Sequence, residues 1–284
     1  MGAGMVEHLR EQGHEVVAWN RSLHALKNVE TVEELVSRLE APRVVWLMLP
    51  NGEVVDEFLQ KLVKLLDRGD MIIDGGNSLY SESQRRGKDL NKLGIKFMDV
   101  GVSGGPSGAR NGACLMIGGE KADYERLEEL WQALAAPKAY AYLGKVGAGH
   151  FAKMVHNGIE YGMMEAIAEG AALLRSADFG YQMAEVFRIY NQRSVIESRL
   201  VGWVQEALAE DESLKDISAA IARTGEGEWT VKTAGELGVD VPVIKKSFEV
   251  RVNSDKDDPC HADGYRNKVV SALRGKFGGH QVKT

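Results

Sequence analysis

Apolar and polar positions follow two different periods along the first half of the chain. The segments with the 3.6-residue period of a helix are 4–12, 32–39, 53–66 and 81–93. The short apolar runs, each of a length typical of a buried strand, are 15–19, 43–49, 71–74 and 96–100. Strands that alternate with helices of this length are joined by right-handed crossovers. The pattern therefore predicts a mostly parallel sheet with helices packed on it.

The second half of the chain has a different texture. Its helical segments are 150–175, 181–190, 195–208 and 241–252, and no convincing strand pattern separates them. We therefore expect an α/β nucleotide-binding domain over residues 1–147, followed by an all-helical domain over residues 148–284. The expected boundary lies at Gly147-Ala148-Gly149, because domain boundaries favour short glycine-rich segments.

The chain begins inside the motif that would open such a nucleotide-binding domain. A Rossmann-like domain starts with a strand and Gly-x-Gly-x-x-Gly, whose third glycine lets the helix pack closely on the sheet. Gly2 fits that third glycine and residues 14–20 fit the second strand, whereas the first strand and two glycines are missing. Two explanations stay open, and we favour a misassigned start or a fragment over a real truncation that weakens cofactor binding.

The residues after the expected second strand bear on the choice of cofactor. Asn20, Arg21 and Ser22 stand where the 2′ position of a dinucleotide is read, and none of them is acidic. Arg21 can pair with a 2′-phosphate, which favours NADP over NAD. The alternative is that Arg21 is an ordinary solvated loop residue.

The composition bears on which partners, metals and compartment are expected for the protein. The 284 residues carry a formal net charge of -6, so a site for an anionic substrate must be a local cluster, and no nucleic-acid partner is expected. The cysteines, Cys114 and Cys260, lie far apart in no metal-ligand spacing, which fits a reducing cytoplasm and argues against zinc. We find neither a signal peptide nor an apolar run long enough to span a membrane.

The start of the long helical segment concentrates polar side chains of several kinds. Lys153, Asn157, Glu160 and Tyr161 fall on one face at helical spacing, and His156 lies at its edge. A single stripe of this kind would more often be solvated surface, since Lys and Glu at helical spacing commonly decorate exposed faces.

Glycine-rich segments elsewhere in the chain favour a functional site over solvated surface for this stripe. Asp74–Ser78 and Gly101–Pro106 each follow a predicted strand, at the sheet edge where ligands bind in open α/β folds. Successive glycines there can turn N–H groups toward an anion. A third such segment, Arg274–His280, lies almost at the C-terminus.

Together these motifs resemble the decarboxylating 6-phosphogluconate dehydrogenases of the β-hydroxyacid dehydrogenase superfamily, and the length resembles the shorter bacterial type. The resemblance covers essentially the whole chain. The family's Asp-Gly-Gly-Asn-Ser, Ser-Gly-Gly, His-x-x-Lys-x-x-His-Asn-x-x-Glu-Tyr and Arg-x-x-Phe-Gly-x-His match Asp74–Ser78, Ser103–Gly105, His150–Tyr161 and Arg274–His280.

The resemblance implies a role for each matched residue. Lys153 would be the general base that accepts the proton of the C3 hydroxyl, and Glu160 the general acid that protonates C1 after carbon dioxide leaves. No metal would be required. Further residues would bind substrate: Ser103, Gly104 and Gly105 the carboxylate, His156 and Asn157 the hydroxyls, and Tyr161, Arg251, Arg274 and His280 the phosphate end. Asn77 would lie between nicotinamide and substrate, and Gly2, Asn20, Arg21 and Ser22 would contact the cofactor.

The resemblance also implies a homo-oligomer, because the family's C-terminal arginine and histidine reach into a neighbouring subunit. One departure is Glu228 in the Gly225–Thr230 segment, where the larger members carry a phosphate-binding lysine. We expect Glu228 to face away from the phosphate or to orient Arg251. Two alternatives stay open: another β-hydroxyacid dehydrogenase acting on a small 3-hydroxy acid, and a non-catalytic paralogue that binds sugar phosphate or only oligomerises.

Overall fold

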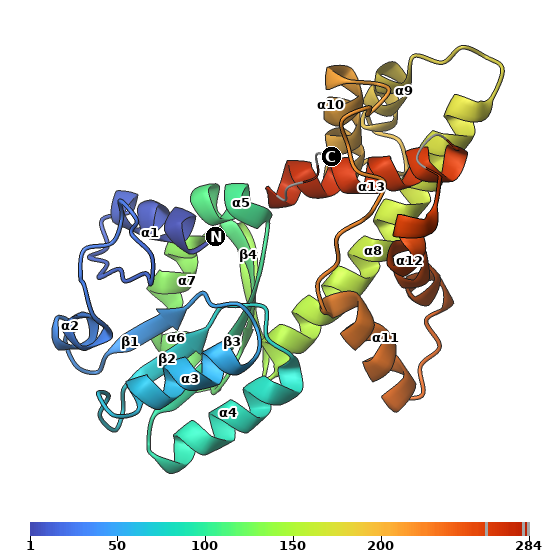
Figure 1. Cartoon of the computed structure of the whole chain (residues 1–284). Helices are drawn as coiled ribbons and strands as arrows, with labels where there is room; N and C mark the ends of the chain where they lie inside the picture. Colours follow the sequence, from blue (N-terminus) through green and yellow to red (C-terminus); the bar gives the residue numbers. More distant parts are fainter. Residues whose placement is uncertain (259–260, 280–281, 283–284) are drawn as a thin grey trace. The chain divides into compact units, whose positions relative to one another are not determined.

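The computed structural model describes residues 1–258, 261–279 and 282 (Figure 1). The chain divides into two compact units, Met1–Met154 and Val155–Thr284. The division falls inside the long helix α8 (Ala148–Ser176), a few residues beyond the boundary expected from the sequence, which stays a prediction. No helix within the described residues is long and apolar enough to cross a membrane.

The first unit is an α/β domain built on a five-stranded sheet with the order β1-β2-β3-β4-β5. Its strands are β1 (Val44–Leu47), β2 (Met71–Asp74), β3 (Lys96–Ser103), β4 (Ala113–Gly118) and β5 (Ala135–Gly144). Its helices are α1 (Gly2–Glu11), α2 (Val32–Ser37), α3 (Glu53–Leu62), α4 (Tyr80–Lys92), α5 (Gly105–Asn111), α6 (Lys121–Arg126) and α7 (Glu128–Leu134). Every strand pair is parallel except β3 with β4, which confirms the mostly parallel Rossmann-like sheet.

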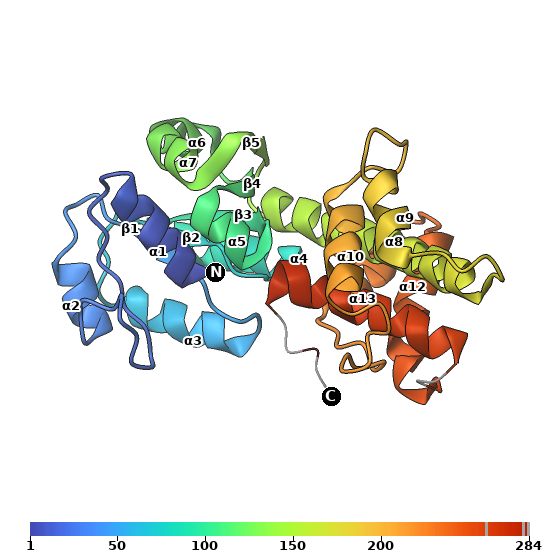
Figure 2. The same cartoon turned by 90° about the horizontal axis from the view of Figure 1, so that it is seen from above.

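The central strands β2 and β3 are buried on both faces, because most of their positions are apolar. Along β2, Met71 and Ile73 pack into one core with α1, α5 and α7, while Ile72 packs into a second core with α2, α3 and α4. Figure 2 shows α3 and α7 on opposite sides of the strands. Continuous apolar runs are the expected pattern for strands covered on both faces.

The strand predicted at residues 15–19 is wrong. Residues 14–20 join no ladder of the described sheet, whose edge on that side is β1. The segment is fixed by other contacts: the Ala18 N–H donates to Asn28 Oδ1 at 2.7 Å, and the Trp19 indole donates to the Glu30 carbonyl at 3.2 Å. An apolar run forms a strand only beside a hydrogen-bonding neighbour. Within the described residues no strand lies beside this segment to complete a ladder.

The second unit is helical, as the sequence predicts. Besides the greater part of α8 it contains α9 (Met183–Tyr190), α10 (Arg199–Glu210), α11 (Glu226–Glu236), α12 (Pro242–Asn253), a 3₁₀ turn at Ser254–Lys256 and α13 (Ala262–Gly278). One core joins the buried side of α8 to α9, α10 and α13. Met164, Ala168 and Ala171 supply that side of α8, at spacings that place them on one helical face.

Candidate active site

The segment after β2 is a tight loop held by a buried carboxylate. Asp74, which is fully buried, accepts hydrogen bonds from the Gly76 N–H at 3.0 Å and the Ser78 hydroxyl at 2.7 Å. A Cβ on Gly75 would lie 2.2 Å from the Trp46 indole nitrogen, and one on Gly76 would lie 2.6 Å from a backbone carbonyl oxygen. Both glycines are therefore required by close packing. The loop places the half-buried Asn77 at the carboxyl end of β2.

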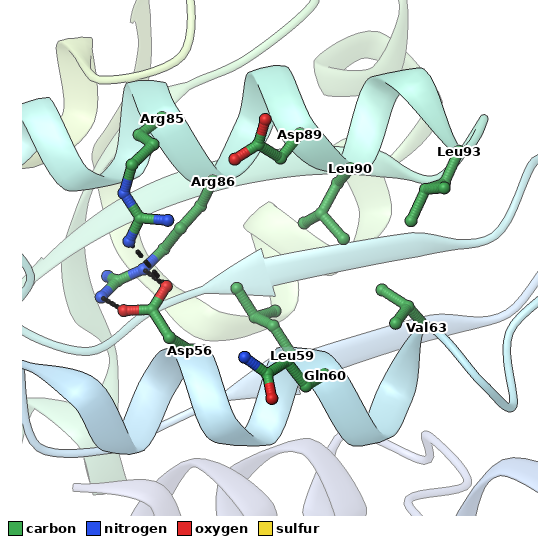
Figure 3. Close-up of a pocket in the computed structure, with 9 residues that line it drawn as sticks. All are labelled: Asp56, Leu59, Gln60, Val63, Arg85, Arg86, Asp89, Leu90 and Leu93. Atoms are coloured by element: carbon green, nitrogen blue, oxygen red, sulfur yellow. Dashed lines mark hydrogen bonds and ion pairs between the residues drawn. The ribbon is translucent and has the colours of Figure 1, made fainter.

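The buried Arg86 connects this loop by hydrogen bonds to a groove between α3 and α4. Arg86 donates to the Ser78 hydroxyl at 3.2 Å and makes hydrogen bonds of 3.1 and 2.9 Å to the two carboxylate oxygens of Asp56. Figure 3 shows Arg85 and Arg86 converging on Asp56 at the rim of a cavity of about 250 Å³. These hydrogen bonds, chiefly those from Arg86, lower the pKa of the Asp56 carboxyl to about 2. The groove carries none of the residues predicted for substrate or cofactor.

The segment after β3 turns directly into α5. Gly104 has a φ of 119°, a left-handed conformation that favours glycine, and a Cβ there would lie 3.1 Å from Gly108 Cα. Ser103, Gly104 and Gly105 are half-buried at this turn. The three residues expected to bind the substrate carboxylate are therefore brought together at the carboxyl end of β3.

Lys153 of α8 packs against the same strand, β3. A Cβ on Gly101 would lie 2.5 Å from Lys153 Cβ and 3.0 Å from the Gly149 carbonyl oxygen, so the first turns of α8 lie directly on the β3 backbone. Gly149 is equally constrained, with a Cβ position 2.4 Å from the Asp99 carbonyl oxygen. The side chain of Lys153 therefore begins beside Gly101, which precedes Ser103 and the glycine-rich turn by two residues.

A buried carboxylate from β3 caps the start of α8. Asp99 accepts hydrogen bonds from the N–H groups of Gly147 at 2.6 Å and His150 at 2.7 Å, two of the donors that a helix N-terminus leaves unsatisfied. A carboxylate there also interacts favourably with the helix dipole. The His150 imidazole forms a hydrogen bond of 2.7 Å with the Ser83 hydroxyl, while its buried Nε2 has no hydrogen-bond partner in residues 1–258, 261–279 and 282. Sequence reasoning missed Asp99 and Ser83, because nothing local marks them as contacts of α8.

In the second unit, α8 carries the next part of the predicted stripe. His156 Nδ1 lies 3.1 Å from Asn157 Oδ1 and 3.8 Å from Glu160 Oε2. All three side chains are half-buried. The structure therefore brings together the two residues expected to bind substrate hydroxyls and the expected general acid, as the helical spacing predicts.

A buried cationic cluster surrounds Tyr161. The Arg251 guanidinium carbon lies 3.4 Å from the centre of the Tyr161 ring, a cation–π contact, and its Nη2 lies 3.9 Å from Met164 Sδ. Arg274 lies close enough to Arg251 that burial, together with the charge of Arg251, lowers the pKa of its guanidinium. Among the described residues, the buried Tyr161 hydroxyl and Arg274 Nε have no hydrogen-bond partner. Two buried cations and an unused hydroxyl are suited to an anionic group, since buried charges require partners.

One acidic residue of α11, Glu226, lies in this cluster, and its neighbour Glu228 does not. Glu226 is buried at the start of α11, and its Oε2 has no hydrogen-bond partner within the part of the chain that the structure describes. Its charge acts on Arg274. A Cβ on the adjacent Gly227 would lie 2.6 Å from the Tyr161 ring, which shows how closely α11 packs there. Glu228, the residue singled out in the sequence, is exposed instead. Glu226 was missed, although it belongs to the same Gly-x-Gly-x-Trp-Thr segment.

The remaining predicted residues lie outside these clusters. Gly2 starts α1, and a Cβ there would lie 3.3 Å from Met48 Cβ, just after β1, as expected of a glycine that lets a helix approach the sheet. Asn20, Arg21 and Ser22 form an exposed turn in which the Asn20 amide donates to the Ser22 carbonyl at 3.2 Å. His280 lies outside the described residues. Within the described residues, no three His, Cys, Asp or Glu side chains gather as metal ligands would.

Comparison with known proteins identifies the family of each half of the chain. The family model for the NAD-binding domain of 6-phosphogluconate dehydrogenase matches residues 1–149, and that for the C-terminal domain of the enzyme matches residues 149–283. The chain belongs to the 6-phosphogluconate dehydrogenase family. It is thus a member of an oxidoreductase family and contains an NAD(P)-binding domain.

Individual 6-phosphogluconate dehydrogenases resemble the chain over its full length. YqeC of Bacillus subtilis, to which the activity is assigned provisionally, is 41% identical over 100% of this chain and 96% of its own. The NAD(+)-dependent decarboxylating enzyme of Haloferax volcanii is 37% identical over 99% of this chain and 95% of its own. The solved Plasmodium falciparum 6-phosphogluconate dehydrogenase has a TM-score of 0.81 at 28% identity, covering 96% of this chain and 68% of that one.

Proposed function

We propose that the chain catalyses the oxidative decarboxylation of 6-phospho-D-gluconate to D-ribulose 5-phosphate and carbon dioxide, with NADP as the favoured oxidant. The observation that carries the proposal is the position of two residues of α8. The side chain of Lys153 begins in close contact with Gly101, near the end of β3, and Glu160 lies two turns further along the same helix. Seven residues of helix separate their Cα atoms by roughly 10 Å along the axis. Two long side chains and a substrate between them can span that separation.

Lys153 acts as the general base. Its amine accepts the proton of the C3 hydroxyl while the hydrogen on C3 leaves with its electron pair, so that C3 becomes a ketone. A bound nicotinamide supplies the acceptor for that hydride. The product is a β-keto acid, in which the electrons of the C1–C2 bond can flow to the C3 oxygen as carbon dioxide leaves. The protonated Lys153 then donates a hydrogen bond to the enolate oxygen, which stabilises the developing charge.

Glu160 acts as the general acid that completes the reaction. After the loss of carbon dioxide, the carbon that becomes C1 of the product requires a proton, and Glu160 supplies it. In support, His156 Nδ1 lies 3.8 Å from Glu160 Oε2, one turn earlier on the same helix. General acids and bases of this kind typically contribute about 10²–10⁴-fold to the rate.

The substrate is held at both ends. Ser103, Gly104 and Gly105 bind its carboxylate, and His156 and Asn157 bind its hydroxyls. The phosphate binds in the cluster of Tyr161, Arg251 and Arg274, and His280 also contributes, as the resemblance implies. In support, the charge of Arg251 acts on the buried Arg274 of the same chain, and Arg274 Nε has no hydrogen-bond partner among the described residues. Arg274 thus lies in the cluster of its own chain, so the tail residue that would reach a neighbouring subunit is His280. A homo-oligomer whose C-terminal tails are shared between subunits remains part of this proposal, as do a cytoplasmic location and the domain limits 1–147 and 148–284.

The residues present fit part of a dinucleotide site. Gly2 brings the start of α1 against Met48, beside the carboxyl end of β1, and a helix N-terminus in that place suits a pyrophosphate. Arg21 is exposed and has no acidic neighbour in its turn, which suits a 2′-phosphate. Asn77 would contact the nicotinamide. The first two glycines of the fingerprint are not among the residues of the chain.

The direct test is nucleotide reduction, followed by near-ultraviolet absorbance, with 6-phosphogluconate as substrate and with NADP or NAD. Wild type should reduce NADP faster than NAD, and Lys153→Met and Glu160→Gln should each lower turnover by about 10²–10⁴-fold. Arg21→Glu is a matched variant that should reverse the nucleotide preference while leaving turnover with NAD intact. Activity with a small 3-hydroxy acid but none with 6-phosphogluconate would contradict the substrate. A folded protein that reduces neither nucleotide with any of these acids would favour a non-catalytic paralogue.

A further inference from the structure

The buried carboxylate of Glu226 lies in the cluster that would bind the substrate phosphate. Glu226 is 4% exposed, and its Oε2 has no hydrogen-bond partner among the described residues. Its charge acts on Arg274, which is 5% exposed. A carboxylate removed from water is stable only when a cation or a hydrogen-bond donor compensates for the lost solvation. The free Oε2 therefore calls for a donor that the bound substrate brings with it.

Close packing keeps Glu226 in this place. A Cβ on the adjacent Gly227 would lie 2.6 Å from the Tyr161 ring, and one on Gly158 of α8 would lie 2.6 Å from Thr230 Cγ2. The Thr230 hydroxyl donates a hydrogen bond to the backbone carbonyl of Glu226 at 2.7 Å. The first turn of α11 is thus held against α8, so the carboxylate remains in the cluster when an anion binds.

The charges of the cluster do not balance a fully ionised phosphate. The buried Arg251 and Arg274 supply two positive charges, and the buried Glu226 supplies one negative charge. A phosphate monoester above its second pKa of about 6 carries two negative charges. The occupied cluster would then hold one negative charge in excess, which is unfavourable away from water. Anionic groups that are forced together in a buried site share a proton, as paired carboxylates do.

We propose that Glu226 makes the site bind the substrate phosphate together with one proton, held between a phosphate oxygen and Glu226 Oε2. This inference rests on the proposed function, which puts the phosphate in the cluster. The Tyr161 hydroxyl and Arg274 Nε donate to the other phosphate oxygens, and the shared proton satisfies Oε2. Glu226 thereby determines the protonation state in which the substrate binds.

Other carboxyl groups near the cluster must be distinguished from Glu226. The charge of Glu160 on α8 also acts on Arg274. Burial raises the pKa of Glu165, further along α8, to about 7. The charged groups that act on Glu165 are Arg266, Glu169, Arg251 and Asp257. An anion that approaches the arginines favours protonation of every neighbouring carboxyl, so the experiment has to assign the proton to one residue.

The test is the uptake of protons when 6-phosphogluconate binds without nucleotide. Titration calorimetry at about pH 8, in buffers that differ in their enthalpy of ionisation, measures this uptake. The wild type should take up about one proton per site, because the phosphate of the free substrate has lost its second proton at this pH. Glu226→Gln should take up almost none, because its amide group donates directly to the dianion. Glu228→Gln, at the exposed neighbour on α11, and Glu165→Gln are matched controls and should retain the uptake.

The pH dependence of the affinity gives a second measurement. Between about pH 7 and pH 9 the dissociation constant of the wild type should rise about tenfold for each pH unit, and that of Glu226→Gln by no more than about twofold in total. At about pH 8 Glu226→Gln should therefore bind at least as tightly as the wild type, and a loss of binding in this variant would contradict the shared proton.

The outcomes separate this inference from the proposed function. Proton uptake that persists in Glu226→Gln, or a wild type that takes up no proton, would overturn the role of Glu226 and leave the proposed function standing. A folded wild type that binds no 6-phosphogluconate would overturn the proposed function, and the inference with it.

Discussion

The close contact between Lys153 and Gly101 gives the most specific prediction about catalysis. A methyl group at Gly101 would lie 2.5 Å from Lys153 Cβ and 3.2 Å from its Cγ, whereas non-bonded carbons prefer about 3.5–4.0 Å. The first of these atoms is fixed to the helix backbone, so a change of rotamer cannot relieve the clash. Gly101→Ala must therefore move the start of α8 from β3 by about 1 Å. Overpacking of this kind typically costs about 1–3 kcal/mol of stability.

The same displacement would move the general base away from the substrate. A misplacement of about 1 Å can lower a rate by about 10²-fold. We expect Gly101→Ala to remain folded but to lose about that factor in kcat, with little change in KM for NADP. The assay is steady-state nucleotide reduction with 6-phosphogluconate, together with circular dichroism and thermal melting.

Gly235→Ala is the matched control, because a Cβ at Gly235 in α11 would meet nothing within 4 Å. It should retain wild-type turnover and fold. A Gly101→Ala protein that turns over within about twofold of wild type, with the native spectrum, would show that the position of Lys153 does not depend on this contact.

Three further predictions follow from buried charges. Asp99→Ala removes two hydrogen bonds from the start of α8 and should lower the free energy of unfolding of the first unit by about 3 kcal/mol. Urea denaturation measures this change, and an unchanged midpoint of the unfolding transition would mean that water replaces the carboxylate. Arg251→Lys should raise KM for 6-phosphogluconate by about 10–100-fold and leave kcat within a few-fold, since a lysine cannot reproduce a flat guanidinium on Tyr161; an equal loss in both would contradict simple binding. Burial raises the pKa of Glu165 to about 7, although Arg266 Nε lies 3.1 Å from its Oε1. The folded protein therefore holds a proton that the unfolded chain releases above pH 4.5, so this group makes stability fall by up to about 3 kcal/mol as the pH rises from about 4.5 through 7. Glu165→Gln should remove that slope, and parallel slopes for the two proteins in urea denaturation would refute the assignment.

The sequence by itself determined the class of fold and the chemical content of the site. The runs at 43–49, 71–74 and 96–100 are short, mostly apolar and separated by helical segments, which favours strands of a covered sheet, and they are β1, β2 and β3. The long helical period from residue 150 is α8, and its spacing alone placed the half-buried His156, Asn157 and Glu160 together. These features are local, because a side chain's face follows from its position in the repeat.

Only the tertiary structure decided the elements whose local signal is weak or misleading. Residues 15–19 have the composition of a strand, but no strand in the described part of the chain pairs with them. The strand β5 contains Pro137 and shifts register against β4, and α13 is buried on several sides, so neither shows a clear period. The contacts that seat Lys153 also join distant segments: Gly101 and Asp99 come from β3, about fifty residues before the helix they hold. No local pattern encodes a pairing of that kind, because its energy comes from burial and hydrogen bonds that exist only once the chain has closed.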